Sequence, residues 1–281
     1  QALLREFRPG VVVCTQAVPC NLVASEKRAG RLDVPLIACI TDFAAHAYWA
    51  SPGVDVYIVA TEESRRALVE RGVRPSRIRV LGVPIHPDFA EPLDRVETRR
   101  RLGLRTDRPV ILVMGGSQGL GPMEDILSEL ARVTSPHQTV VITGLNATLR
   151  RDLRTRFGSG PNMMLKGYTH DIPQYMASAD LLITKPGGLT SAEALAARLP
   201  MILLTPIPGQ ETRNTQYLLR GGAAQRVLRV GELPGLVDHL LRRPEVRARM
   251  VRAAERLARP HAATDIATLI HEVLESANGN S

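Results

Sequence analysis

One stretch constrains the fold of this chain more than any other: residues 183–217, ITKPGGLTSAEALAARLPMILLTPIPGQETRNTQY. Residues 185–188 (KPGG) break an apolar run, and residues 190–198 then have the composition of a helix interior. Pro200 closes that helix, and residues 201–204 are a second apolar run typical of a buried strand. A strand, a glycine turn, a helix and another strand in this order predict a parallel sheet, whose polar loops follow the carboxyl ends of the strands.

Two loops in this stretch carry residues suited to binding an anion. Gly187 and Gly188 open a helix, where backbone N–H groups and the helix dipole attract negative charge and where the absence of side chains lets a phosphate come close. Residues 208–214 (PGQETRN) form a second polar loop after the next strand. Two structural alternatives stay open. The glycines could serve only the turn, and Thr190 and Glu193 have the spacing of a capping box, in which Thr190 caps the helix and Glu193 reaches back to it.

The motifs KPGGLTSAEALAARLP and PIPGQETRN together resemble the donor-binding signature of the monogalactosyldiacylglycerol synthase and processive diacylglycerol glucosyltransferase family. They are more distantly similar to the peptidoglycan enzyme that adds N-acetylglucosamine to a lipid-linked muramyl peptide. The resemblance extends from about residue 8 to about residue 228. It implies an α/β fold with two Rossmann-like domains of the GT-B type, each with a parallel sheet. The family's N-terminal domain begins with a GGGH-type loop that this sequence lacks, so the resemblance implies that the N-terminal domain is incomplete.

The resemblance also implies an activity. A hexosyltransferase of this family moves a hexose from a UDP-sugar, here UDP-glucose or UDP-galactose, to diacylglycerol or a glycolipid, with inversion at the anomeric carbon. It implies no obligatory metal and no cofactor, the UDP-sugar being a co-substrate. Two alternatives stay open: transfer of N-acetylglucosamine from its UDP-sugar to a lipid-linked peptidoglycan precursor, or a catalytically silent nucleotide-sugar-binding remnant.

The donor site follows from the same resemblance. The glycine-rich loop at 115–119 (GGSQG) and the turn before the central helix would line the diphosphate. Glu193 would hold the ribose, Gln210 and Glu211 would read the sugar hydroxyls, and Asn214 would support the loop or the donor. The complete set of expected donor-binding residues is Gly115, Gly116, Ser117, Tyr168, Pro186, Gly187, Gly188, Thr190, Glu193, Gly209, Gln210, Glu211 and Asn214.

Two members of this set have other interpretations from the residues alone. The loop at 115–119 matches neither the G-x-G-x-x-G order nor a Walker loop, so a plain strand-to-helix turn stays possible. Tyr168 is placed by the resemblance with its backbone against uracil, but it could equally be a core aromatic residue.

The acceptor hydroxyl also needs a general base. The candidates are Asp42 and His46, in the segment TDFAAHAYW that follows a predicted strand at 35–40. Their i, i+4 spacing places both on one face if the segment is helical. A packing or acceptor-positioning role for His46 is the alternative.

Alternating strands and helices predict three regions: residues 1–90 as a partial acceptor-side Rossmann-like domain, residues 95–260 as the UDP-sugar-binding domain, and residues 261–281 as a helix that crosses back to the first domain in the resembled architecture. Residues 86–94 read as the linker. The expected strands are 9–15, 35–40, 55–60, 77–81, 109–114, 139–143, 163–165, one from 180, 201–204 and 225–228. The expected helices are 21–29, one capped by Thr61 and ending near 72, 95–102, 123–132, 172–179, 190–198, 232–242, 244–257 and 261–276.

Composition limits the partners and the compartment. The formal net charge is +8, almost all of it from arginine, which favours an anionic membrane surface or an acidic ligand. Aromatic residues are too few for the stacking platforms of a nucleic-acid binder. Three cysteines without a C-x-x-C motif suggest a reducing compartment and apolar packing rather than disulfides or zinc. We therefore expect a cytoplasmic protein associated peripherally with the inner face of the membrane.

Overall fold

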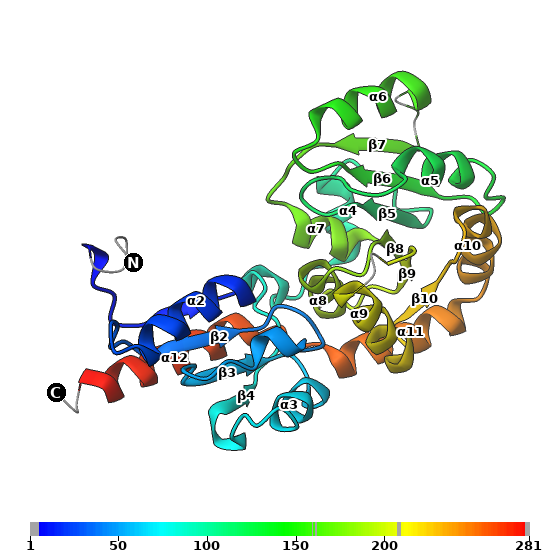
Figure 1. Ribbon diagram of the computed structural model, residues 1–281. Coiled ribbons are helices and arrows are strands. Elements are labelled where there is room, and N and C mark those ends of the chain that lie inside the picture. Colours follow the sequence, from blue (N-terminus) through cyan, green and yellow to red (C-terminus); the bar gives the residue numbers. More distant parts are fainter. Residues whose placement is uncertain (1–5, 159, 161, 207–208, 279–281) are drawn as a thin grey trace. The chain divides into compact units, whose positions relative to one another are not determined.

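The computed structural model describes residues 6–158, 160, 162–206 and 209–278 of the 281-residue chain. It divides into two compact units, Gln1–Pro87 with Arg259–Ser281, and Asp88–Ala258. The domain borders expected from the sequence are residues 90–95 and 260–261. The C-terminal segment thus belongs to the same unit as the N-terminal one (Figure 1).

The first unit is built on a four-stranded parallel sheet in the order β1-β2-β3-β4. Strands β1, β2 and β3 are short apolar runs, and all four residues of β2 are buried because helices cover both faces of the sheet. One face packs on α2 (Ala17–Arg28) and α3 (Glu62–Val69). The strands are β1 (Val12–Cys14), β2 (Leu36–Cys39), β3 (Val56–Val59) and β4 (Ile78–Val80).

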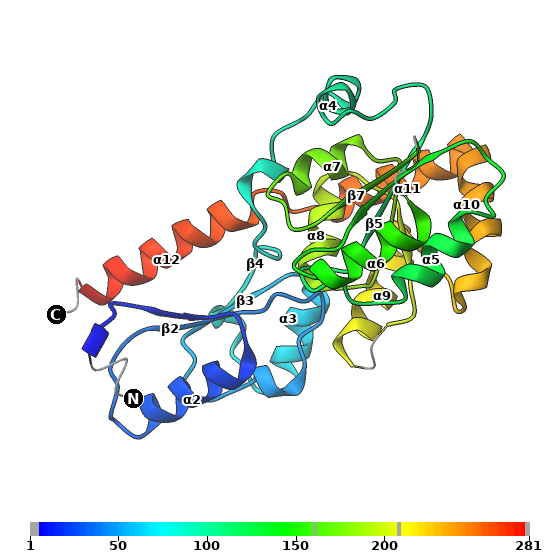
Figure 2. The same ribbon diagram turned by 90° about the horizontal axis from the view of Figure 1, so that it is seen from above.

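The other face of this sheet is covered by α12 (Ala262–Asn278), the last helix of the chain. Its Ile266 and Leu269 form a buried cluster with Ile37, Cys39 and Ile58 of the two central strands. Figure 2 shows α12 and α2 on opposite sides of β2 and β3. One of the two buried clusters of the first unit is therefore closed by residues from the far end of the sequence.

The second unit is built on a six-stranded parallel sheet in the order β7-β6-β5-β8-β9-β10. The chain lays down β5, β6 and β7 in one direction, returns to the other side of β5 for β8, and continues outward, which is the doubly wound order of a Rossmann fold. The strands are β5 (Val110–Met114), β6 (Gln138–Ile142), β7 (Met163–Lys166), β8 (Leu181–Thr184), β9 (Met201–Leu203) and β10 (Ala224–Arg226).

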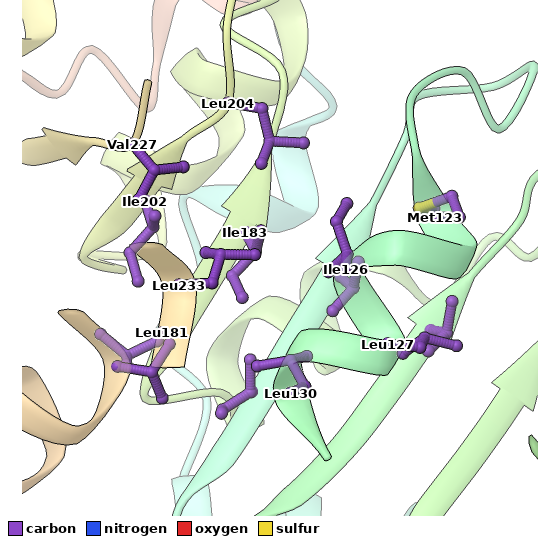
Figure 3. Packing of buried hydrophobic residues seen from close by; sticks show 14 of the residues in the cluster. Met123, Ile126, Leu127, Leu130, Leu181, Ile183, Ile202, Leu204, Val227 and Leu233 are labelled. Atoms are coloured by element: carbon purple, nitrogen blue, oxygen red, sulfur yellow. The ribbon is translucent and has the colours of Figure 1, made fainter. Parts of the chain in front are cut away.

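A large buried cluster lies on one face of this sheet, between the strands and four helices. Figure 3 shows α5 residues and Leu233 of α10 packed on side chains of β8 and β9. Leu153 of α6 and Met250 of α11 extend the same cluster. The four helices are α5 (Met123–Leu130), α6 (Ala147–Phe157), α10 (Leu233–Arg242) and α11 (Pro244–Leu257).

A buried ion pair lies at the amino ends of two central strands of this sheet, β5 and β8. Asp94 caps α4 (Arg95–Arg101) by accepting the backbone N–H of Glu97 at 2.7 Å. Arg99, on that helix, is buried and places its Nη2 2.6 Å from Oδ2 of Asp180. The same carboxylate oxygen accepts the backbone N–H of Val110 at 2.7 Å. This contact joins α4 to the beginnings of β5 and β8.

Most expected elements are confirmed within a few residues, and the differences are local. Two helices were not predicted: α6, which Asn146 caps through Leu149 N at 2.9 Å, and α9 (Gln210–Gly221), which ends at Gly222 with a left-handed φ of 80°. Helix α2 begins at Ala17 rather than at residue 21. The other helices are α7 (Ile172–Ser178) and α8 (Gly188–Ala196). No helix in the described part of the chain is long and apolar enough to cross a bilayer.

Candidate functional site

The expected donor-binding residues follow strands that end at one edge of the second sheet. Met114 of β5 is in register with Ile142 of β6 and with Thr184 of β8, and these two are in register with Lys166 and Leu203, respectively. The loops after five neighbouring strands therefore leave the sheet side by side. Ligands of doubly wound sheets bind along this carboxyl edge.

Within that edge, the strand order reverses between β5 and β8, the position at which such sheets bind their ligands. The two strands are linked at this point by Thr184, whose buried Oγ1 donates to the carbonyl of Met114 at 2.9 Å. Gly115 and Gly116 directly follow β5, and Lys185, Pro186 and Gly187 directly follow β8. The topology brings these two groups of expected residues together.

The turn after β5 needs glycine for its own conformation. A Cβ atom on Gly115 would lie 2.4 Å from the carbonyl oxygen of Leu120, and the Leu120 N–H donates to the Gly115 carbonyl at 2.9 Å. Gly116 has a φ of 73°, in the left-handed region. The Ser117 carbonyl accepts the N–H of Leu145 at 2.8 Å, which fixes the turn against the next loop. The conformation of the turn therefore explains why residue 115 is glycine. Ser117 is exposed and Gly116 is partly exposed, so both are accessible to a ligand.

Helix α8 begins two residues earlier than expected, and its amino end has no side-chain cap among the described residues. Gly187 is the N-cap residue, so Thr190 lies inside the first turn and the predicted capping box with Glu193 is wrong. A Cβ atom on Gly187 would meet nothing within 4 Å in the described chain, and its φ of −70° suits any residue. Neither packing nor backbone strain explains glycine at this position.

A lysine that the sequence analysis did not include lies beside this helix end. Nζ of Lys185 is 2.8 Å from Oε1 of Glu211, and both side chains are largely buried. The Cε atom of Lys185 would be 3.5 Å from a Cβ on Gly116. A positive charge is thus held next to the turn after β5 and the turn before α8. The sequence could have identified Lys185, because it directly precedes the Pro186-Gly187-Gly188 turn and lysine is a common phosphate ligand.

The second polar loop is in fact the start of a helix. Gln210, Glu211 and Asn214 lie on α9, with Gly209 as its N-cap residue, so the prediction that they lie in a loop is wrong. Pro208 lies outside the described residues. Asn214 is fully buried, and its Nδ2 donates to the carbonyl of Pro186 at 3.1 Å. Asn214 therefore supports the turn before α8, while Gln210 and Gly209 are exposed.

Glu193 lies on α8, in the second turn, and is half-buried. Removal of its carboxyl group from water raises the pKa of Glu193 from 4.5 to about 7. A buried carboxylate that is costly to ionise gains stability in its ionised form from hydrogen-bond donors on a ligand. This environment is consistent with the ribose role that the resemblance implies.

Tyr168 is on the surface, with 57% of the residue exposed, so a core packing role is wrong. Its ring meets that of His170 edge to face, with 5.2 Å between the centroids. Tyr168 follows the carboxyl end of β7 and so belongs to the same sheet edge as the glycine turns.

The two candidate bases lie in the first unit, after the carboxyl end of β2. The segment from Asp42 to His46 is irregular, so the helical face that their spacing suggested does not exist. The carbonyl of Phe43 accepts from Thr61 Oγ1 at 2.9 Å and from Ser64 Oγ at 2.8 Å, which fixes this segment to the start of α3. The His46 ring lies 6.0 Å from that of Trp49, centroid to centroid.

Among the residues that the structure describes, no group of three or more His, Cys, Asp or Glu side chains is arranged to hold a metal ion. The expectation that the reaction needs no metal and no cofactor is untested and stays a prediction.

Comparison with known proteins agrees with this arrangement. The family model of monogalactosyldiacylglycerol (MGDG) synthase matches residues 1–85, and that of the glycosyltransferase family 28 C-terminal domain matches residues 110–266. The processive diacylglycerol beta-glucosyltransferase of Staphylococcus carnosus is 35% identical over 221 residues, which are 78% of this chain and 56% of that protein. The chain thus spans about half the length of the curated relatives that it matches.

Solved structures show the same fold at low sequence identity. The complex of MnaA from Staphylococcus aureus with UDP has a TM-score of 0.74 and 16% identity, covering 98% of this chain and 78% of that one. MurG from Acinetobacter baumannii has a TM-score of 0.68 and 19% identity, covering 96% and 76%. The predicted α/β architecture of two Rossmann-like domains with parallel sheets, of the GT-B type, is confirmed. With the family's C-terminal domain over more than half of its length, the chain belongs to glycosyltransferase family 28.

Proposed function

We propose that this protein transfers a hexose from a UDP-sugar to diacylglycerol or a glycolipid, with inversion at the anomeric carbon. One observation carries the proposal: the amino end of α8, without a side-chain cap among the described residues, lies at the strand-order reversal beside Gly116 and Lys185. Such an end offers backbone N–H groups and a partial positive charge to a diphosphate. The names of the relatives, as diacylglycerol glucosyltransferases, support the acceptor class.

In this proposal the second unit binds the donor. The backbone N–H groups at Gly187, Gly188 and Thr190 face the diphosphate, with Gly116 and Ser117 on its other side.

The other parts of the donor contact neighbouring residues of the same unit. Glu193 accepts hydrogen bonds from the ribose hydroxyls, and the backbone around Tyr168 faces the uracil. Gln210 contacts the hydroxyl groups of the sugar. Asn214 keeps the turn at Pro186 in place through its hydrogen bond to the Pro186 carbonyl.

In this proposal, Lys185 stabilises the negative charge that develops on the leaving UDP. During transfer the acceptor oxygen forms a bond to the anomeric carbon while the bond from that carbon to the phosphate oxygen breaks, so UDP leaves with an additional negative charge. An ammonium group and a helix amino end that are fixed before the reaction stabilise that charge with little reorganisation. Glu211 holds the ammonium at 2.8 Å and is also a candidate to contact the sugar.

The acceptor hydroxyl must lose its proton as it attacks. Asp42 and His46 are the proposed bases, and both follow β2 at the carboxyl edge of the first sheet. A base in this position acts on a hydroxyl group bound by the first unit. The variants Asp42→Asn and His46→Gln should distinguish the two candidates. The variant that lacks the true base should lose turnover and retain its affinity for UDP.

A peripheral position on the cytoplasmic face of an anionic membrane is part of the proposal. Among the large apolar side chains that the first unit exposes are Val18 and Leu22 of α2 and the neighbouring Tyr48. Asn21 of α2 fixes the Tyr48 backbone beside this helix, because its Nδ2 donates to the Tyr48 carbonyl at 2.7 Å. The net charge of +8 would favour anionic lipid. Sedimentation with phosphatidylglycerol vesicles should retain the wild type and release a Val18→Ser, Leu22→Ser double variant.

The deciding experiment is a transfer assay. The chain is incubated with labelled UDP-glucose, UDP-galactose or UDP-N-acetylglucosamine, and with vesicles that contain diacylglycerol, a glycolipid or the lipid-linked peptidoglycan precursor. Hexose on diacylglycerol or glycolipid supports the proposal. N-acetylglucosamine on the peptidoglycan precursor would support the alternative that the likeness to MurG suggests. UDP binding without transfer to any acceptor would support a nucleotide-sugar-binding protein without activity.

A further inference from the structure

Arg150 is a positively charged residue of the second unit to which the proposed donor site gives no role. It lies on α6, the helix that follows β6 and contacts β7 (Figure 1). Its guanidinium reaches the residue that follows β7, since a Cβ atom on Gly167 would lie 2.7 Å from Nη1 and 3.4 Å from Cζ of Arg150. The guanidinium therefore lies against the backbone of Gly167, directly before Tyr168.

Glycine at position 167 leaves the space that this guanidinium occupies. The φ of Gly167 lies outside the left-handed region, so backbone strain does not require a glycine there. The next neighbour of a Cβ at this position is the carbonyl oxygen of Gly144 at 3.7 Å, an ordinary van der Waals distance. A side chain at position 167 would therefore displace the Arg150 guanidinium before it disturbed the backbone around it.

The Arg150 side chain has hydrogen-bond donors available to a ligand. Among the described residues, no oxygen accepts a hydrogen bond from its guanidinium and no carboxylate forms an ion pair with it. Two other arginines of α6 differ in this respect, because Arg151 pairs with Asp152 and Arg156 pairs with Glu124. A guanidinium carries five N–H donors and no acceptor. Arg150 therefore suits a ligand group that accepts hydrogen bonds, such as a carbonyl oxygen.

We propose that Arg150 selects the base of the sugar donor by donating to the O4 carbonyl of uracil. This step rests on the proposed function, in which the backbone around Tyr168 faces the uracil. O4 is the uracil carbonyl farther from the ribose. With the ribose at Glu193 of α8, this carbonyl lies toward β7, the edge strand on the far side of β5 and β6. Cytosine carries an amino group in place of O4, and that group donates. A guanidinium that faces it meets a second donor, so cytosine is disfavoured.

The test compares UDP with CDP, two ligands that differ only in the base, by calorimetry on the whole 281-residue chain. The wild type should bind UDP at least about tenfold more tightly than CDP. Arg150→Met should lower the affinity for UDP by about 10- to 100-fold and leave that for CDP within about twofold, at an unchanged melting temperature. Arg151→Met is the matched control, because it removes the same charge from the same helix and should bind both ligands as the wild type does.

Gly167→Ala provides a second readout that leaves Arg150 in place. Its methyl group would displace the guanidinium, so this variant should lose the same preference for UDP, and it should add no further loss in the Arg150→Met background. Equal losses for UDP and CDP in Arg150→Met, or a preference for UDP that survives this substitution, would overturn the role of Arg150 and leave the proposed function standing. A wild type that binds neither nucleotide would overturn the proposed function as well.

Discussion

At the scale of single residues, Glu193 carries a cost to folding, and the proposed ribose contact gives it a role in binding. Its folded-state pKa of about 7 lies above the ordinary value of 4.5, so the folded chain holds a proton that the unfolded chain has released. The destabilisation is absent below pH 4.5, grows as the pH rises, and is complete above pH 7. Glu193→Gln should therefore raise the unfolding free energy at pH 8 by up to about 2 kcal/mol after allowance for solvent screening, with a higher melting temperature, and should change both little at pH 4.

The same substitution, Glu193→Gln, should weaken binding of the sugar donor. Ribose hydroxyls donate to a carboxylate, so the ligand favours the ionised form and its affinity should fall as the pH decreases below about 7. Calorimetry with UDP-glucose, whose diphosphate does not titrate near neutrality, should show this dependence in the wild type and not in Glu193→Gln. We expect a loss of about 10- to 100-fold at pH 8. A variant that is more stable and binds equally well would remove Glu193 from the ribose role.

Substitution of Lys185 should affect binding of the diphosphate and not binding of the nucleoside. Lys185→Met removes the ammonium beside the amino end of α8, so UDP affinity should fall by about 10- to 100-fold, while uridine affinity should stay within about twofold. A Lys185→Met, Glu211→Gln double variant removes the partner charge as well and should show the same selective loss. Equal losses for UDP and uridine would indicate that Lys185 only supports the fold.

At the scale of elements, α4 is attached to the second unit through buried Arg99, whose Nε donates to the Ser178 carbonyl at 2.8 Å and whose Nη2 pairs with Asp180. Arg99→Ala removes the guanidinium 2.6 Å from Asp180 and the bond to Ser178, and leaves only the more exposed Arg95 at 3.2 Å from that carboxylate, so it should lower the unfolding free energy by about 3 kcal/mol. Arg100→Ala, on the same helix, removes an exposed pair with Glu97 at 3.5 Å and should cost less than about 1 kcal/mol. Urea denaturation measures both; similar values would contradict the role given to Asp180.

Sequence patterns predicted the sheet better than the site. The apolar runs that became β5 and β8 are strands of the expected length because burial on both faces requires such runs. Helix α6 was missed although Leu149, Leu153 and Phe157 recur at helical spacing and pack in the core. Helix α9 was read as a loop because its polar first turn was interpreted by its chemistry alone.

The contacts that define the site depend on pairs distant in the sequence. Lys185 and Glu211 are 26 positions apart and meet only because α9 begins as a helix directly after β9 and its loop. Asn214 and Pro186 are 28 positions apart. The capping box failed because backbone geometry made Gly187 the N-cap residue, which spacing alone does not reveal.

At the scale of the whole molecule, the chain end completes the first unit. Truncation after Ala258 would remove α12 and uncover Ile37, Cys39 and Ile58. Labelling of Cys39 by a thiol reagent should then become at least about tenfold faster, because the helix no longer excludes water from this face. UDP affinity should persist, since every expected donor residue lies within Asp88–Ala258. Unchanged labelling of Cys39 would contradict the packing of α12 on this sheet.

The central claim is that a diphosphate occupies the space beside Gly187, and a calorimetric titration with UDP tests it most directly. Gly187→Ala adds a methyl group where the described chain has no atom within 4 Å, so the fold should be unaffected while the phosphate is displaced. Gly231→Ala is the matched control, since a Cβ there also meets nothing within 4 Å. We predict that Gly187→Ala binds UDP at least about tenfold more weakly than the wild type, at equal melting temperature, and that Gly231→Ala binds normally. Full UDP affinity in Gly187→Ala would contradict the account.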